Sequence, residues 1–207
     1  MLETIETDRL NRRFAVILSS AVALISLLLA MLSPIWLIGL PLAFLVYRFL
    51  RRRTVRRLEV VERPFPNELE SALVRHVTFF RALDDDGKQR FRKMVQVFLD
   101  ETPITGIRTQ VDQTTRALVA ASAVIPVFGF DHWEYSGLGE ILIYPNAFAD
   151  DYSTGGTNDH IERRTLGMVG VGHLSGVMIL SKPDLISGFD NPEDNRNVGI
   201  HEFAHLV

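Results

Sequence analysis

The feature that most restricts the fold is a run of 34 residues without a charged side chain, at 14–47. One helix of that length would extend over roughly 51 Å, whereas the hydrocarbon layer of a bilayer is about 30 Å thick. Ser33 and Pro34 interrupt the run near its middle. We therefore predict a hairpin of two membrane spans, at about 14–32 and 35–50. The alternatives are one tilted span with an interfacial extension and a helical hairpin buried in a soluble domain.

Arginine residues lie on both sides of this run. Positive charge favours the cytoplasmic side of a membrane. A two-span hairpin with both ends in the cytoplasm places both groups of arginines on that side. We expect the rest of the chain to face the cytoplasm from a bacterial inner membrane. The arginines at 51–57 are also expected to contact anionic lipid head groups, at about 1 kcal/mol each near the surface. The flanking residues are Arg9, Arg12 and Arg13 before the run and Arg48, Arg51, Arg52, Arg53, Arg56 and Arg57 after it.

Charge divides the chain into two parts at a linker that contains two prolines, residues 62–66. Residues 1–63 contain 10 Arg and 5 acidic residues, a net charge of +5, and residues 64–207 carry a net charge of −8. We predict a membrane anchor with basic flanks over 1–63 and a separate domain over 64–207. An acidic domain gives no reason to expect nucleic-acid binding. The absence of cysteine excludes disulfides, thiolate metal sites and cysteine nucleophiles.

The second part combines helical and strand patterns. Apolar residues and capping signals predict helices over about 68–82, 84–99 and 112–125, and short apolar strands are expected at 140–144 and 177–180. The polar residues after position 180 are expected to end the second strand, which offers an edge to an extended peptide. Helices, then a few strands and a final helix predict an α+β domain with a small sheet packed on helices.

The last seven residues begin with His201-Glu202-Phe203-Ala204-His205, the His-Glu-x-x-His pattern of helical zinc sites. Positions i and i+4 of a helix lie one above the other, so His201 and His205 can bind one metal ion. Glu202 lies about 100° further round the helix, where it can act as general base towards a zinc-bound water. We predict that Asn191 caps this helix and that Pro192 begins it.

A catalytic zinc ion normally has three protein ligands and a water molecule. The two histidines of the motif supply two ligands, and we expect the third to lie beyond Val207, in a part of the protein that this chain lacks. The remaining histidines are more often surface or core residues than ligands. They are His76, His132, His160 and His173.

The segment Asn197-Val-Gly-Ile-His-Glu-Phe-Ala-His205 resembles the zinc peptidases related to Mlc titration factor A. Weaker similarity in order and spacing is seen at 91–99, 111–125 and 139–148, so the resemblance covers about 64–207. It implies a zincin-like core and peptidase activity, often that of an aminopeptidase.

By the same resemblance, His201 and His205 are zinc ligands and Glu202 is the catalytic base. The family's third ligand is a glutamate well beyond the motif, and this chain ends before it. Founding members are soluble, so the apolar hairpin is a departure from the family. We therefore do not carry over the repressor binding that the family name suggests.

These observations lead to one main hypothesis and one rival. The main hypothesis is a membrane-anchored zinc peptidase that hydrolyses peptide or protein substrates with a zinc-activated water. The rival is a non-catalytic, membrane-tethered binding module that keeps the fold but is inactive because the third zinc ligand is missing.

Overall fold

A computed structural model describes residues 2–130, 134–135, 137–146, 148–149, 164–165, 167–169, 176–190 and 197–207. The chain divides into two compact units, Met1–Arg63 and Pro64–Val207. Each unit is described by itself below.

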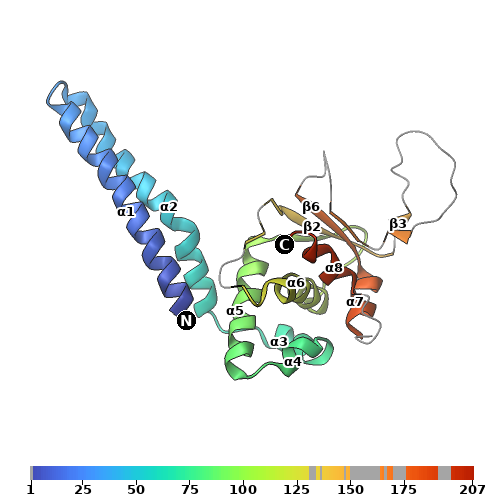
Figure 1. The fold of residues 1–207 in the computed structure, drawn as a ribbon. Helices are drawn as coiled ribbons and strands as arrows, with labels where there is room; N and C mark the ends of the chain where they lie inside the picture. Colours follow the sequence, from blue (N-terminus) through green and yellow to red (C-terminus); the bar gives the residue numbers. More distant parts are fainter. Residues whose placement is uncertain are drawn as a thin grey trace. The chain divides into compact units, whose positions relative to one another are not determined.

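The first unit is a pair of long helices joined by a short 3-10 turn (Figure 1). The predicted break at Ser33-Pro34 is confirmed, because Ser33 is the N-cap of the 3-10 turn and Pro34 occupies its first position. The elements are α1 (Leu2–Ala30), η1 (Pro34–Ile38) and α2 (Gly39–Glu62).

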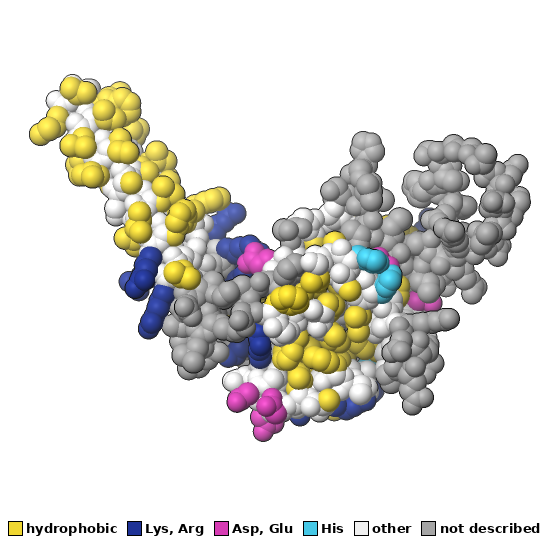
Figure 2. All heavy atoms as spheres, in the orientation of Figure 1, with side chains coloured by type: hydrophobic (Ala, Val, Ile, Leu, Met, Phe, Trp, Pro, Cys, Tyr) yellow, Lys and Arg dark blue, Asp and Glu magenta, His cyan; other side chains and the backbone are white. Residues whose placement is uncertain are grey.

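Small residues line the contact between α1 and α2, and large apolar residues face outward. Ala15, Ser26, Gly39 and Ala43 are buried. A Cβ atom on Gly39 would lie 1.8 Å from the Ser26 hydroxyl oxygen, so only glycine allows the two helices to approach so closely. Figure 2 shows hydrophobic side chains covering the part of the hairpin that contains the turn.

Both helices are long and apolar enough to cross a membrane. Only 11% and 6% of their most apolar windows are buried within the structure. By themselves, the two helices thus leave most of their apolar side chains uncovered.

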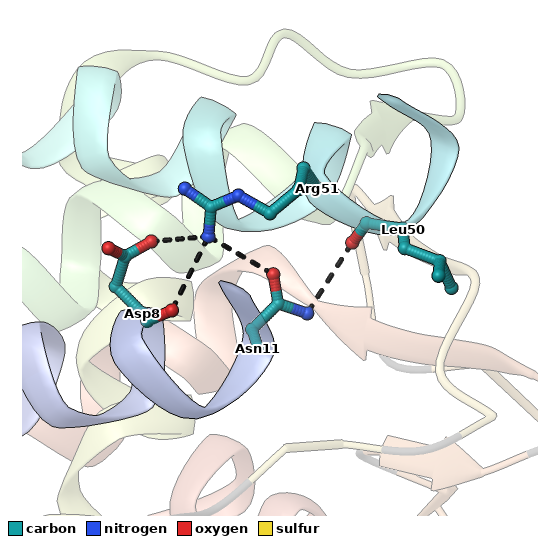
Figure 3. A network of polar contacts seen from close by, with 4 residues as sticks. All are labelled: Asp8, Asn11, Leu50 and Arg51. Atoms are coloured by element: carbon teal, nitrogen blue, oxygen red, sulfur yellow. Dashed lines mark hydrogen bonds and ion pairs between the residues drawn. The ribbon is translucent and has the colours of Figure 1, made fainter. Parts of the chain in front are cut away.

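A polar network joins the two helices at the open end of the hairpin (Figure 3). The Arg51 guanidinium donates to the Asp8 carboxylate and, at 3.2 Å, to the side-chain oxygen of Asn11. The Asn11 amide donates in turn to the backbone carbonyl of Leu50 at 3.4 Å. The Arg51 side chain is largely buried in this network, so its charge is directed inward, towards Asp8.

The second unit contains six helices among its described residues. The predicted helix over 68–82 is in fact two helices, separated at Val77, whose backbone is extended. Arg81 explains the break, since its guanidinium donates to the carbonyls of Val74 and Arg75 at 3.0 and 2.9 Å and satisfies the end of the first helix. The helices are α3 (Asn67–His76), α4 (Thr78–Ala82), α5 (Asp85–Glu101), α6 (Gln113–Val127), α7 (Lys182–Asp190) and α8 (Val198–Ala204).

Four strands form one small sheet in the order β1-β2-β6-β5. The first three are parallel, and β5 runs antiparallel to β6. The prediction that the strand at 177–180 offers a free edge is wrong, because β2 and β5 pair with its two sides. The strands are β1 (Ile104–Gly106), β2 (Glu140–Tyr144), β5 (Gly167–Val169) and β6 (Val177–Ser181), and a separate pair is formed by β3 (Phe148–Ala149) and β4 (Arg164–Thr165).

The prediction that polar residues end this strand is confirmed, because β6 ends at Ser181 and a new segment begins at Lys182. It forms α7 at once, with Pro183 in the first turn, where proline is tolerated. The Ser181 hydroxyl donates to the Asp184 carboxylate and stabilises this start.

Helix α6 lies at the centre of the second unit, as Figure 1 shows, and packs against α3, α5, α7 and α8. Its alanine-rich sequence is buried on nearly every side because small side chains let several elements approach it. Asp112 caps the helix by accepting a hydrogen bond from the Thr115 N–H at 2.7 Å. The Lys182 ammonium, at the start of α7, donates to the same carboxylate at 2.8 Å.

We predict that Asp112 makes the second unit sensitive to acid. Burial raises the pKa of this carboxyl, but hydrogen bonds from Lys182 and Thr115 outweigh that effect and lower the pKa from 3.8 to about 2. A pKa that is lower in the folded state stabilises the fold above the unfolded pKa, and this contribution is lost as the pH falls towards the folded pKa. Asp112→Asn keeps a capping side chain without the charge, so its urea midpoint should fall less steeply than the wild-type midpoint between about pH 4 and pH 2.

Far-UV circular dichroism of the detergent-solubilised protein provides the measurement. Lys182→Met is the matched partner variant and should flatten the same pH range. An acid dependence of Asp112→Asn identical to that of the wild type would contradict the assignment.

Candidate metal centre

Helix α8 begins at Val198, and its N-cap is Asn197. The Asn197 side-chain oxygen accepts a hydrogen bond from the Ile200 N–H at 3.0 Å. The predicted cap, Asn191, and the predicted first residue, Pro192, lie outside the described residues. The prediction missed Asn197, although an asparagine three residues before an apolar position is itself a capping signal.

One side of α8 is seated on the core by a close contact and an aromatic cluster. Gly199 is buried, and a Cβ atom there would lie 2.2 Å from the Ser122 hydroxyl oxygen of α6. The Phe203 ring lies 5.7 Å from that of Phe98 and 5.2 Å from that of Tyr135, measured between ring centroids. The contact with Ser122 fixes the distance between α8 and α6, and the ring contacts fix the rotation of α8.

Tyr135 packs in this aromatic cluster, and its hydroxyl is occupied by a hydrogen bond. Its hydroxyl donates to the Ala123 carbonyl at 2.6 Å, and burial raises the pKa of the phenol well above its ordinary value. Tyr135 is therefore a packing residue of this cluster.

The other side of α8 presents the two histidines of the motif to solvent. The Nε2 atoms of His201 and His205 lie 3.0 Å apart, and the rings meet edge to face at 85°. His205 follows the last helical residue, but its backbone is still helical, and its N–H bonds to the His201 carbonyl at 3.3 Å. The i,i+4 relation between the imidazoles is therefore kept at the end of the helix.

This arrangement fits one zinc ion. Two nitrogens bound at about 2.1 Å with tetrahedral angles are about 3.4 Å apart, close to the observed separation. Both imidazoles are exposed, which leaves room for a water molecule and a further ligand. Glu202 is half-buried beside them. No group of three or more metal-binding side chains converges among the residues that the structure describes.

The other histidines do not complete the site within the described part of the chain. His76 lies at the end of α3, where its Nδ1 atom is 2.9 Å from the Asp190 carboxylate. The remaining three lie outside the described residues. They are His132, His160 and His173.

Comparisons with known proteins place the motif in a wider context. The sequence profile of the glucose-regulated metallo-peptidases M90 matches residues 49–207 of this chain. An uncharacterized protein of Synechocystis sp. is 26% identical over 154 residues, which are 73% of this chain and 56% of the relative. The chain thus spans little more than half the length of that relative. No solved structure shows significant similarity.

The seating of α8 can be tested by filling the space at Gly199. In most helices, Gly→Ala stabilises by up to about 1 kcal/mol. Here we expect Gly199→Ala to destabilise the second unit by about 1–3 kcal/mol, because the new methyl group meets Ser122 and Leu185. The readout is the unfolding midpoint in urea. Ser122→Ala in the same chain removes the nearest atom and should restore part of the loss, and a stabilised Gly199→Ala variant would show that α8 does not sit this closely on α6.

Proposed function

Because this chain belongs to the family of glucose-regulated metallo-peptidases M90, we propose that it is a membrane-anchored zinc peptidase whose site lies on α8. The observation that carries the proposal is the convergence of the His201 and His205 Nε2 atoms at the spacing of two zinc ligands. We propose residues 64–207 as the peptidase domain, with a zincin-like core, and residues 1–63 as the membrane anchor.

In this proposal the two imidazoles hold the metal and Glu202 moves protons. A bound zinc ion polarises the scissile carbonyl and lowers the pKa of its water molecule. Glu202 follows His201 directly, so its carboxylate lies beside the pair without competing for the same position. There it accepts the proton of the attacking water and passes it to the leaving amine.

The substrate class follows from the chemistry and from the sheet. A metallopeptidase acts on peptide or protein substrates, and an extended peptide binds well to the open edge of a sheet. β5 is the outermost strand of the described sheet on the side next to β6, and α8 packs against β5. We propose that β5, rather than β6, offers the edge to which the substrate adds.

One observation keeps the rival function in consideration. The described residues bring together only two metal-ligand side chains. A non-catalytic binding module tethered to the membrane would need no third ligand, and it would show neither peptide hydrolysis nor retained zinc.

The anchor is proposed to insert into a bacterial cytoplasmic membrane with both ends in the cytoplasm. The support comes from two apolar helices with exposed side chains and from arginines on both flanks. Among the arginines expected to contact anionic head groups, Arg51 forms an ion pair with Asp8. Arg52 is exposed, and its guanidinium lies over the Phe49 ring. The others are Arg53, Arg56 and Arg57.

Two substitutions separate the base from the ligand. In a protein that also contains the expected third ligand, Glu202→Gln is nearly isosteric but cannot take a proton, so hydrolysis should fall by about 100- to 10,000-fold while the metal is retained. His201→Ala should instead remove the metal as well as the activity. Hydrolysis is measured with labelled casein and with alanine p-nitroanilide, which distinguish endopeptidase from aminopeptidase activity, and zinc by atomic absorption after dialysis.

Glu68→Gln, at an exposed position on α3, is the matched control and should leave both values unchanged. Near-normal turnover in Glu202→Gln would rule out its role as base. Wild-type protein that retains no zinc and cleaves neither substrate would favour the binding module.

The orientation of the anchor is tested by fusions at its two ends. Alkaline phosphatase is active outside the cytoplasm and green fluorescent protein inside it, so both reporters are attached before Met1 and, separately, after Arg63. We expect fluorescence and no phosphatase activity at both positions, because arginines flank both ends of the apolar run. Opposite results at the two ends would establish a single span.

A further inference from the structure

We propose that the hairpin is re-entrant, so that its turn lies against the acyl chains of the distal leaflet and does not reach the water beyond. This inference rests on the membrane anchoring proposed above. It concerns how far the anchor penetrates and which part of the lipid its turn contacts.

The polar network at the open end sets the level at which the hairpin enters the bilayer. Arg51 bonds to both Asp8 and Asn11, so the last charged residues before the turn, Arg13 and Arg48, come at similar levels on the two helices. Arginine side chains remain at the head-group level of a membrane. The depth to which the hairpin enters the bilayer can therefore be measured along each helix from Arg13 or Arg48 to the turn.

Although each whole helix is long enough to cross a membrane, the uncharged part of each arm is shorter than the bilayer with its head groups. Seventeen residues separate Arg13 from Ala30 at the end of α1, which is roughly 26 Å of helix. On the other arm, the 3-10 turn and the part of α2 from Gly39 to Arg48 add to at most about 24 Å. A bilayer is about 30 Å thick in its hydrocarbon layer and about 40–45 Å with its head groups. An arm of this length brings the turn only to the distal edge of the hydrocarbon.

The amino-acid composition of the turn is suited to an apolar environment. It has no charged residue, and its large side chains are among the most exposed in the described chain: Met31 is 89% exposed, Leu32 82% and Ile38 72%. Side chains of this kind are less stable in water than in an apolar environment. A loop in the water on the far side of the membrane would not be stabilised by these exposed apolar side chains.

The backbone of the turn also tolerates an apolar environment. The N–H groups of Met31, Leu32 and Trp36 bond to carbonyls one turn earlier, and Pro34 has no N–H. Unsatisfied backbone donors are what exclude irregular segments from hydrocarbon, and the 3-10 turn removes most of them here. The Trp36 indole has the amphipathic character of residues found at a membrane interface.

The chain contains no cysteine, so single introduced cysteines report the position of the turn. Ser33→Cys places a thiol in the turn, and Thr54→Cys places one among the arginines of α2, just after Arg53, as the control. Each variant is treated with a membrane-impermeant maleimide in right-side-out and in inside-out vesicles, then with a permeant maleimide and in detergent. Carbonate extraction first shows whether the protein is membrane-embedded.

We expect Ser33→Cys to resist the impermeant reagent from both sides and to react with the permeant one or in detergent. Thr54→Cys should react with the impermeant reagent in inside-out vesicles only. Labelling of Ser33→Cys by the impermeant reagent in right-side-out vesicles would overturn the re-entrant hairpin but leave the anchor intact. Release of the protein by carbonate would overturn the anchor itself, and neither result bears on peptide hydrolysis.

A second measurement covers a thiol that fails to react at all. The chain has two tryptophans, so Trp133→Phe leaves Trp36 as the only one. In reconstituted vesicles, lipids brominated on their acyl chains should quench its fluorescence, whereas iodide added outside should not. Quenching by iodide with none by brominated chains would place the turn in water and contradict the proposal.

Discussion

The position of the histidine pair depends on the contact between α8 and α6. Gly199 brings the backbone of α8 against Ser122, where a larger residue forces one of the two helices to move. Phe203 fixes the rotation of α8 because its ring packs on Phe98 and Tyr135. Once these contacts are made, the histidines must point away from the core. A helix of seven residues has little stability alone, so this packing, and not helix propensity, holds the pair in place.

The two units of the chain follow opposite packing rules. In the hairpin, small residues such as Ser26 and Gly39 lie inside and large apolar residues lie outside. In the second unit the largest buried side chains include Phe80, Phe91 and Phe203, as in a protein folded in water. The same amino-acid types thus occupy inverted positions within one chain. A single solvent does not favour both arrangements, and this contrast supports the membrane anchor proposed above.

Local patterns in the sequence predicted the features that depend on neighbouring residues. The break at Ser33-Pro34 and the main helices and strands of the second unit could be read from spacing and capping signals. The break at Val77 could not, because it depends on the Arg81 guanidinium bonding to carbonyls of the preceding helix. The interior position of β6 was also missed, since apolar periodicity shows that a strand is buried but not which strands pair with it. At the candidate site, the sequence was enough to identify the residues of the motif. The close contact between Gly199 and Ser122 could be known only from the fold.

The way α8 is held also bears on how metal binding relates to folding. Small zinc domains often fold only when the metal binds, so the free energy of binding also supplies the free energy of folding. Here the helix is capped by Asn197 and seated by Phe203, and none of these contacts involves His201 or His205. The two Nε2 atoms already lie within 3.0 Å of each other. Apolar packing on the opposite side of the helix therefore places the stretch of backbone that carries both imidazoles. At the proposed metal site, binding would therefore use a pair that the fold has already placed, and the stability of the second unit would rest on its core instead of on the metal.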